Sequence, residues 1–399
     1  MKKNNKKNAS VVSKIKVLGI GGAGGSVVNR MAKAPIFGVD YIALNTDQQA
    51  LSTIRNSVQK IIIGKTITKG WGTGMNPEIG RAAVEENIAE VREALKGADI
   101  IFITAGLGGG TGTGAAPIVA DLAKELKSLV IGVVTKPFSF EGAARQSIAE
   151  EGLRKLSNRV DALAAISNNR ILEVIDKSTP LLKAFSMADE ILNQGVTAIT
   201  DTLNKPGLIN IDFANIKMIL EGAGPAILNS ASASGEGRAN QIIKSVLDNS
   251  LFELPIDGAK NVLLAISGSS NLKMNEVNEI AQAITHQIDK QARVIFGATI
   301  NEFLEDEIRV TLVATGFNKI NPPMQIKKIE TSPLEDQFTP LEILKEKRLS
   351  KDNLSLTGFT GLNKTAAEEV NNKAVIIEEQ SPQGDEYEIP AFLRRKISK

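Results

Sequence analysis

The sequence predicts an α/β protein with a parallel sheet, a long central helix, a smaller α+β second domain and a disordered C-terminal linker that ends in a short peptide. Three observations predict this fold. Short apolar runs alternate with helical patterns in the first half of the chain, which is typical of a parallel sheet covered on both faces. A single long helical pattern follows, and shorter strands and helices alternate after it. Regular periodicity fades beyond Phe317.

Five apolar runs of strand length precede the long helix. They span Ile15–Ile20, Tyr41–Leu44, Ile61–Ile63, Ile100–Thr104 and Leu129–Val134. Helical patterns separate them over Val27–Ala34, Pro77–Leu95 and Ala115–Leu126. Asn76 suits the N-cap of the second helix and Pro77 its first position. Pro117 likewise suits the first turn of the third helix, where an N–H has no partner in any case.

The long helix is expected from Ser178 to about Leu203, where apolar residues recur at helical spacing until Pro206-Gly207 ends it. The unit after it has helices at Ala239–Leu247 and Asn275–Asp289 and strands at Asn261–Ile266, Val294–Thr299 and Ile308–Ala314. We therefore divide the chain into a basic N-terminal tail (1–13), a sheet domain (14–177), a central helix (178–205), an α+β domain (206–317), a disordered linker (318–384) and a C-terminal peptide (385–399).

Composition excludes several classes of function. The chain has no cysteine and a single histidine, so it has no disulfide or thiolate metal site, and a Ser-His triad is improbable. His286 itself is expected at the surface. The net charge of +2 does not suggest a nucleic-acid binder. With neither an apolar run of membrane length nor a signal peptide, we expect a cytoplasmic protein without direct membrane insertion.

Glycines dominate two segments that follow predicted strands. Gly108–Gly114 holds five glycines in seven residues, and Gly21–Gly25 follows the first strand. Glycine contributes nothing to a core but lets a bare backbone approach a ligand. A glycine loop before a helix is a seat for phosphate, so two such loops at strand ends, facing one crevice, suit a triphosphate.

Two other nucleotide motifs fit less well. Gly19–Gly24 satisfies the G-x-G-x-x-G pattern of dinucleotide-binding proteins, but those use one glycine loop, and a dehydrogenase would lack catalytic groups nearby. Gly64-Lys65-Thr66 resembles the end of a P-loop, yet Gln59 stands where its first glycine belongs. We reject the P-loop and keep the dehydrogenase as an alternative that nucleotide binding would decide.

The whole set of motifs resembles the FtsZ family, the bacterial cell-division GTPases of the tubulin superfamily. Gly108–Gly114 is similar to the tubulin signature loop. Further matching stretches are Lys16–Gly22, Ala43–Asp47, Thr104–Leu107, Pro137–Gly142, Asn169–Leu172, Gly207–Phe213 and Glu388–Leu393. The resemblance covers about residues 14–317 and the last dozen, and it implies a GTPase that forms filaments.

The resemblance implies a GTP or GDP site in the first domain, with Mg2+ held mainly by the phosphates. Phosphate contacts would come from Gly21, Gly22, Ala23, Gly24, Gly25, Ser26, Gly108, Gly109, Gly110, Thr111 and Gly112. Glu141 resembles the acid that contacts the ribose, and Arg145 a nearby nucleotide contact. Asn168 and Asp189 resemble the pair that reads guanine, with Phe185 stacked on the base. A carboxylate suits this task, because guanine presents N1–H and amino donors that adenine lacks there. Ser26 replaces a usual asparagine, with little expected effect.

The segment Asn210–Asn215 resembles the loop that enters the nucleotide site of the next subunit. The family usually has carboxylates at the positions of both Asp212 and Asn215, which position the attacking water and the cation. Asn215 carries no charge, and a lost general base typically costs about 10²–10⁴ in rate. We therefore expect intact assembly with weakened hydrolysis. Alternatively Asn215 is tolerated, because phosphoryl transfer relies chiefly on positioning and electrostatics.

The resemblance also implies partners. Subunits would stack head to tail, a contact that does not close and so makes filaments at the division site. Apolar residues return in the final stretch, and Asp385–Arg395 would dock on a membrane adaptor of the FtsA, SepF or ZipA type. Two alternatives stay open. One is a nucleotide-dependent filament protein with little or no GTP turnover, and the other is a plasmid-segregating filament, which this C-terminal peptide disfavours.

Overall fold

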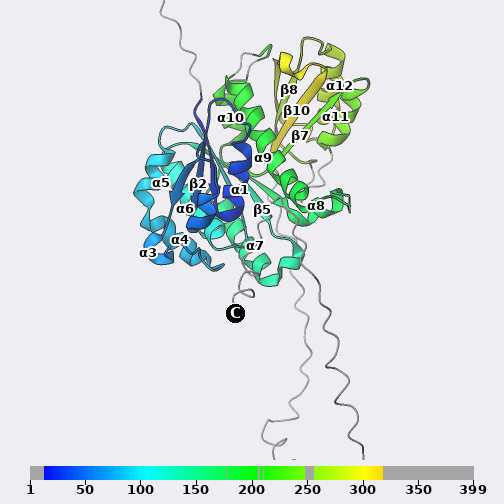
Figure 1. The fold of residues 1–399 in the computed structure, drawn as a ribbon. Coiled ribbons are helices and arrows are strands. Elements are labelled where there is room, and N and C mark those ends of the chain that lie inside the picture. Colours follow the sequence, from blue (N-terminus) through cyan, green and yellow to red (C-terminus); the bar gives the residue numbers. More distant parts are fainter. Residues whose placement is uncertain (1–12, 177, 205–206, 210, 248–255, 318–399) are drawn as a thin grey trace, which may run out of the picture. The chain divides into compact units, whose positions relative to one another are not determined.

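The computed structural model in Figure 1 describes residues 13–176, 178–204, 207–209, 211–247 and 256–317. Predictions for the N-terminal tail, the linker, the C-terminal peptide and Asn210 therefore lie outside the described residues, apart from Ser13 at the end of the tail. His286 is exposed at the end of a helix, as predicted.

The first six strands form a parallel sheet, as the alternating pattern predicts. They are β1 (Ile15–Ile20), β2 (Val39–Asn45), β3 (Gln59–Ile62), β4 (Ile100–Gly106), β5 (Leu129–Lys136) and β6 (Ala162–Ser167). Their order is β3-β2-β1-β4-β5-β6, with β1 between β2 and β4. All six carboxyl ends therefore meet at one edge of the sheet, which we call the carboxyl edge, opposite the amino edge.

Helices cover both faces of this sheet (Figure 1). They are α1 (Gly21–Met31), α2 (Gln48–Ser52), α3 (Lys65–Thr68), α4 (Pro77–Glu86), α5 (Ile88–Leu95), α6 (Thr111–Glu125), α7 (Ala143–Ser157) and α8 (Asn168–Val174). Side chains alternate along each strand, so Val17 joins a core cluster with α1 while Leu18 joins another with α4, α5 and α6. This double burial explains the continuous apolar runs of the strands.

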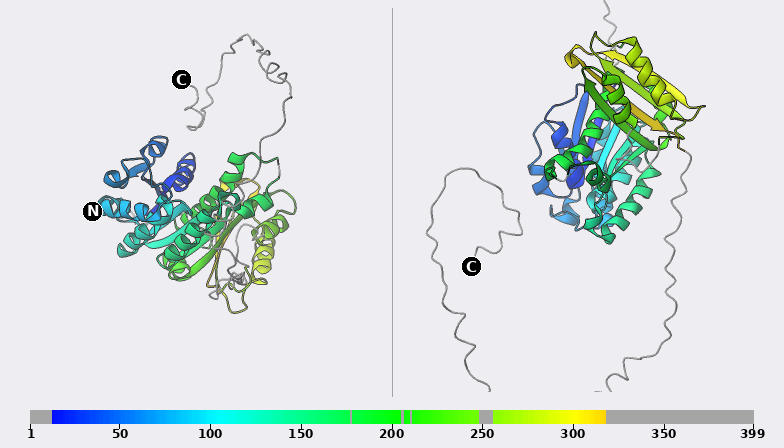
Figure 2. Two further views of the ribbon diagram at one scale, coloured as in Figure 1. Left: turned by 90° about the horizontal axis from the view of Figure 1, so that it is seen from below. Right: turned by 90° about the vertical axis from the view of Figure 1, so that its right-hand side faces the viewer.

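The remainder begins with the long helix α9 (Leu181–Asn204), which contacts α1 and α8 on one side and later strands on the other. The later elements are α10 (Phe213–Leu220), β7 (Gly224–Ser234), α11 (Arg238–Leu247), β8 (Asn261–Gly268), α12 (Met274–Thr285), β9 (Arg293–Ile300) and β10 (Glu307–Thr315). Strand β10 runs antiparallel between β7 and β8, and β9 lies parallel to β8 (Figure 2). The start of β7 also pairs with the start of β6, which joins all ten strands into one sheet.

Several helix boundaries differ from the prediction; for example, α12 ends at Thr285 rather than Asp289, and α9 begins at Leu181 rather than Ser178. Helix α1 begins at Gly21 rather than Val27, and α6 at Thr111 rather than Ala115, so Pro117 lies in the second turn instead of the first. Glycine disfavours helix locally, but here the glycine turns pack closely on strands, and tertiary contact overrides propensity. The predicted helix Pro77–Leu95 is two helices, because Asn87 leaves the helical conformation and its side chain accepts the Gly64 N–H.

The longer elements missed from the sequence are α7, β6, α8, α10 and β7. Strand β7 is rich in serine and alanine, so it lacks an apolar alternation. Helix α7 is largely polar, with only three buried residues. Both elements are fixed by partners far along the chain, which a local pattern does not reveal.

Candidate nucleotide-binding site

The two glycine segments meet at the carboxyl edge. Helix α1 starts directly after β1, and α6 starts five residues after β4. A Cβ on Gly21 would lie 3.0 Å from the backbone nitrogen of Gly112, so the starts of the two helices touch. The first N–H groups of a helix lack partners within it, and its dipole favours an anion there. Two converging helix starts therefore make a strong phosphate site.

The glycines of this cradle fall into two groups. A Cβ on Gly24 would overlap the Thr104 carbonyl, and one on Gly112 would lie 2.8 Å from the Gly106 carbonyl, so these glycines allow helix and strand to touch. Gly22 and Gly109 instead have no neighbouring atom within 4 Å of a Cβ. The other predicted phosphate contacts lie in the same two turns: Gly21, Ala23, Gly25 and Ser26 in α1, and Gly108, Gly110 and Thr111 around the start of α6.

A buried cluster of threonines supports the cradle, and the sequence analysis assigned only Thr111 of it to the site, not Thr46 or Thr73. The Thr111 hydroxyl lies 2.7 Å from that of Thr46 at the end of β2 and 3.4 Å from that of Thr73. All three residues are buried. The signal available in the sequence was Asn45-Thr46-Asp47, a polar run directly after an apolar strand.

Glu141 and Arg145 lie beside the signature loop, after β5. Their side chains form an ion pair, and Glu141 also accepts the Phe138 N–H at 2.9 Å. The Arg145 carbonyl lies against Gly108, because a Cβ there would be 2.8 Å from it. Arg145 Nε is buried without a hydrogen-bond partner among the described residues. A buried donor next to two helix starts fits a phosphate or ribose oxygen as its acceptor.

The two polar residues predicted to read the base lie on separate elements. Asn168 begins α8 directly after β6, and Asp189 lies on the first half of α9. Both are buried, at 9% and 8% exposure. The Asp189 carboxylate forms an ion pair with Arg30 of α1, a residue that the sequence analysis did not single out. Phe185 lies on the turn of α9 before Asp189, and its side chain is outside the described part of the structure.

Asp212 and Asn215 are not brought to this cradle within the subunit. Asp212 is the N-cap of α10, and its Oδ1 accepts the Asn215 N–H at 2.7 Å. Two contacts bracket α10 at the amino edge: Asn204 Oδ1 accepts the N–H of Ser13 before β1, and the Gly224 N–H donates to Asp161 before β6. A seven-residue strand such as β4 separates the edges by about 20 Å.

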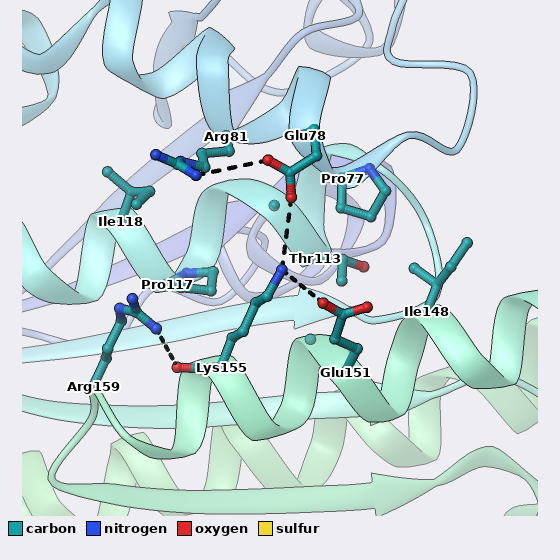
Figure 3. A pocket seen from close by; sticks show the side chains of 12 residues that line it. Pro77, Glu78, Arg81, Thr113, Pro117, Ile118, Ile148, Glu151, Lys155 and Arg159 are labelled. Carbon is teal, nitrogen blue, oxygen red and sulfur yellow. Dashed lines mark hydrogen bonds and ion pairs between the residues drawn. The ribbon is translucent and has the colours of Figure 1, made fainter.

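A cavity of about 400 Å3 lies on another side of α6, between α4, α6 and α7 (Figure 3). Pro77, Pro117 and Ile118 contribute apolar lining, and the Lys155 ammonium lies between Glu78 and Glu151 at 3.6 and 2.9 Å. Because the charges that line it are already paired, it lacks the free donors that polyphosphate needs. The cradle, open to solvent at Gly22, is the better nucleotide site.

Two further properties concern metals and membranes. Among the described residues, no three histidine, aspartate or glutamate side chains gather as a metal site. None of the helices in the described part is long and apolar enough to span a membrane.

A parallel sheet with a phosphate cradle at its carboxyl edge defines a class of nucleotide-binding proteins. Residues 14–176 match the model of the Tubulin/FtsZ family, GTPase domain, and residues 224–318 match that of the FtsZ family, C-terminal domain. The chain belongs to the Tubulin/FtsZ family, whose GTPase domain binds GTP and GDP.

Solved structures agree with this assignment. An FtsZ dimer from M. jannaschii is 40% identical, with a TM-score of 0.70 over 76% of this chain and 88% of that one. CetZ1 from Haloferax volcanii, a GDP-bound monomer, is 23% identical, with a TM-score of 0.65 over 77% and 96%. CetZ2 from the same organism, a GTPγS-bound protofilament, is 24% identical, with a TM-score of 0.64 over 77% and 94%. The CetZ likeness concerns the fold alone.

Proposed function

We propose that this protein binds GTP at the glycine cradle, polymerises head to tail and hydrolyses GTP at a site completed by Asp212 of the next subunit. The observation that carries the proposal is the separation of cradle and Asp212 across the sheet, about 20 Å. A group that acts on the attacking water must come within about 3 Å of it. Asp212 cannot do so within its own subunit, but a stacked neighbour would present it.

Exposed apolar side chains support stacking, because both edges of the sheet carry them. Trp71 is 82% exposed on the loop after α3, and Phe140 is 74% exposed after β5, both at the carboxyl edge. Leu208 is 74% exposed on the segment before α10, at the opposite edge. Large exposed apolar side chains rimmed by polar residues are typical of association surfaces. Within the cradle, Mg2+ would be held mainly by the phosphates.

We further propose that Asn215 weakens hydrolysis. The third position of a helix favours an acidic side chain by about 0.3–1 kcal/mol, because of the helix dipole. An amide at this position of α10 is therefore not explained by helix stability, whereas it removes a charge from the proposed interface. Asp212 retains its carboxylate and would still orient water.

The change Asn215→Asp tests this proposal. We expect phosphate release under assembly conditions to rise at least tenfold, toward the 10²–10⁴ typical of a general base. Thermal stability should stay equal or rise slightly, because the new carboxylate lies in the first turn of α10. Asn215→Ser is the matched control, since it changes the side chain without adding charge. A wild-type rate that Asn215→Asp leaves unchanged would contradict the role given to Asn215.

The same assay addresses the alternative of a filament protein with little or no turnover. That function is favoured if wild type assembles with GTP, releases no phosphate and disassembles only on dilution. If the protein instead binds dinucleotides and does not bind guanosine nucleotides, the dehydrogenase alternative is favoured.

For the cellular role, we propose the division ring, with filaments tethered to a membrane adaptor of the FtsA, SepF or ZipA type through Asp385–Arg395. The family membership supports the ring, and the apolar residues of this segment support the tether. Binding of a peptide spanning residues 385–399 to purified adaptors tests it. Absence of binding to all three types would favour a plasmid-segregating filament.

A further inference from the structure

The ion pair between Arg30 and Asp189 joins the two ends of the candidate nucleotide site. Asp189 is the carboxylate assigned to guanine, and its side chain is only 10% exposed. Arg30 lies on the last turn of α1, and its Nε donates to Asp189 Oδ2. The first turn of the same helix forms part of the phosphate cradle. The helix would thus contact phosphates at its start, and it contacts the proposed base-reading residue near its end.

The dimensions suit this arrangement. Arg30 lies nine positions after Gly21, which corresponds to about 14 Å along an α-helix. A nucleotide lying beside α1, with its phosphates at Gly21, would therefore place its base near Asp189.

The chemistry of the pair leaves room for a base. A carboxylate offers about four lone-pair sites on two oxygens. Arg30 is the one side chain among the described residues that donates to Asp189, and it occupies Oδ2 alone. Oδ1 is left to accept the guanine N1–H, and the second lone pair of Oδ2 to accept the amino group. A buried carboxylate without a partner would be costly, and the guanidinium of Arg30 provides that partner.

We propose that Arg30 is a positioning residue for guanine recognition, which rests on the proposed reading of guanine by Asp189. Arg30 fixes the orientation of the Asp189 carboxylate, so that its free lone pairs face the donors of the base. Since Arg30 belongs to α1, the same helix sets the position of the base reader relative to the phosphate cradle.

The test compares GDP with IDP, whose base lacks the 2-amino group of guanine, by equilibrium binding to the full chain. Wild type should prefer GDP. Arg30→Met should weaken GDP binding by about 10- to 100-fold, the size of a hydrogen bond to a charged group, and weaken IDP binding less. The GDP/IDP preference should therefore fall. Arg30→Lys should lie between, because it keeps the charge without the planar donor fork; it carries the test alone if Arg30→Met does not fold.

Arg92→Met is the matched control, since it removes an arginine of similar exposure that is paired with a carboxylate, Glu125 in α6, away from the cradle. It should leave the GDP/IDP preference unchanged. A double-mutant cycle completes the design: in an Asp189→Asn background, Arg30→Met should have no further effect on the preference.

Three results would overturn the proposal. An equal loss of GDP and IDP binding in Arg30→Met would reduce Arg30 to a structural role. Tighter GDP binding would mean that Arg30 competes with the base for Asp189. A wild type that binds GDP and IDP equally would instead refute the assignment of Asp189 to guanine, and the proposed base site with it.

Discussion

At the scale of single residues, glycine serves two purposes within one helical turn, and substitutions separate them. Gly24 lies against the Thr104 carbonyl, while Gly22 faces open space. We expect Gly24→Ala to destabilise the fold by about 1–3 kcal/mol through overpacking. Gly22→Asp should fold as well as wild type, since an acid is favoured at a helix start, but its charge should repel phosphate and abolish GDP binding.

Thermal unfolding and GDP titration of the two variants check this prediction, with Gly22→Ala as the uncharged control. Gly22→Ala should keep both stability and most of the binding. Full GDP affinity in Gly22→Asp would show that this open position does not face the phosphates.

Some residues of the candidate site could be predicted from the sequence, and others could not. The cradle glycines were predictable because glycine is costly unless a backbone must be bare, and their neighbours are local. The ion pair between Arg30 and Asp189 was not predictable, because the two residues are 159 positions apart and the sequence around each gives no sign of the contact. Thr46 and Thr111, 65 residues apart, meet only because β2 and β4 flank the same strand.

At the scale of elements, one buried guanidinium ties together two helices and a turn of the second domain. Arg238 at the start of α11 is 4% exposed and donates to Glu276 of α12 at 2.7 Å and to Asp306 before β10 at 2.9 Å. Its hydrogen bond to Glu276 lowers the pKa of that carboxyl. None of these contacts follows from the local periodicity that predicted α11 and α12.

We expect Glu276→Gln to destabilise the protein by about 1–3 kcal/mol at pH 7, since it weakens a charged hydrogen bond and leaves a buried cation less compensated. The pKa of Glu276 is lower in the folded than in the unfolded state. Its contribution is therefore complete above its unfolded pKa, about 4.3, and is lost as pH falls through the lower folded pKa. Denaturant unfolding from pH 7 to pH 3 checks this. The difference in the free energy of unfolding between wild type and Glu276→Gln should decrease below about pH 4. If this difference does not change with pH, the loss of stability in Glu276→Gln comes from packing and not from the charge of Glu276.

Element prediction succeeded where a strand is buried on both faces and failed where stability comes from pairing. Strands β1, β4 and β5 are predominantly apolar, because helices cover both sides of them. Strand β7 has small polar residues and is fixed by its antiparallel pairing with β10, some 80 residues away. Its side chains therefore carried no strand signal.

At the scale of the whole molecule, the proposed active site is divided between subunits, and this makes a complementation experiment possible. Gly109→Asp should block the cradle without disturbing the fold, because no atom lies within 4 Å of its Cβ position. Asp212→Asn should remove the catalytic charge while keeping the N-cap of α10, since asparagine caps as well as aspartate.

We expect each variant alone to release little or no phosphate from GTP, whereas an equal mixture should recover activity. In random head-to-tail stacking, about a quarter of the interfaces would join an intact cradle to an intact Asp212, so up to about a quarter of the wild-type rate should return. The matched control mixes Asp212→Asn with a chain carrying both substitutions, which creates no intact interface and should stay inactive. Two results would contradict the divided site: phosphate release in the control mixture, or no phosphate release in the first mixture although its two variants co-sediment. Either result would place the whole hydrolytic site within one subunit. That conclusion would conflict with the distance of about 20 Å that one strand puts between the cradle and Asp212.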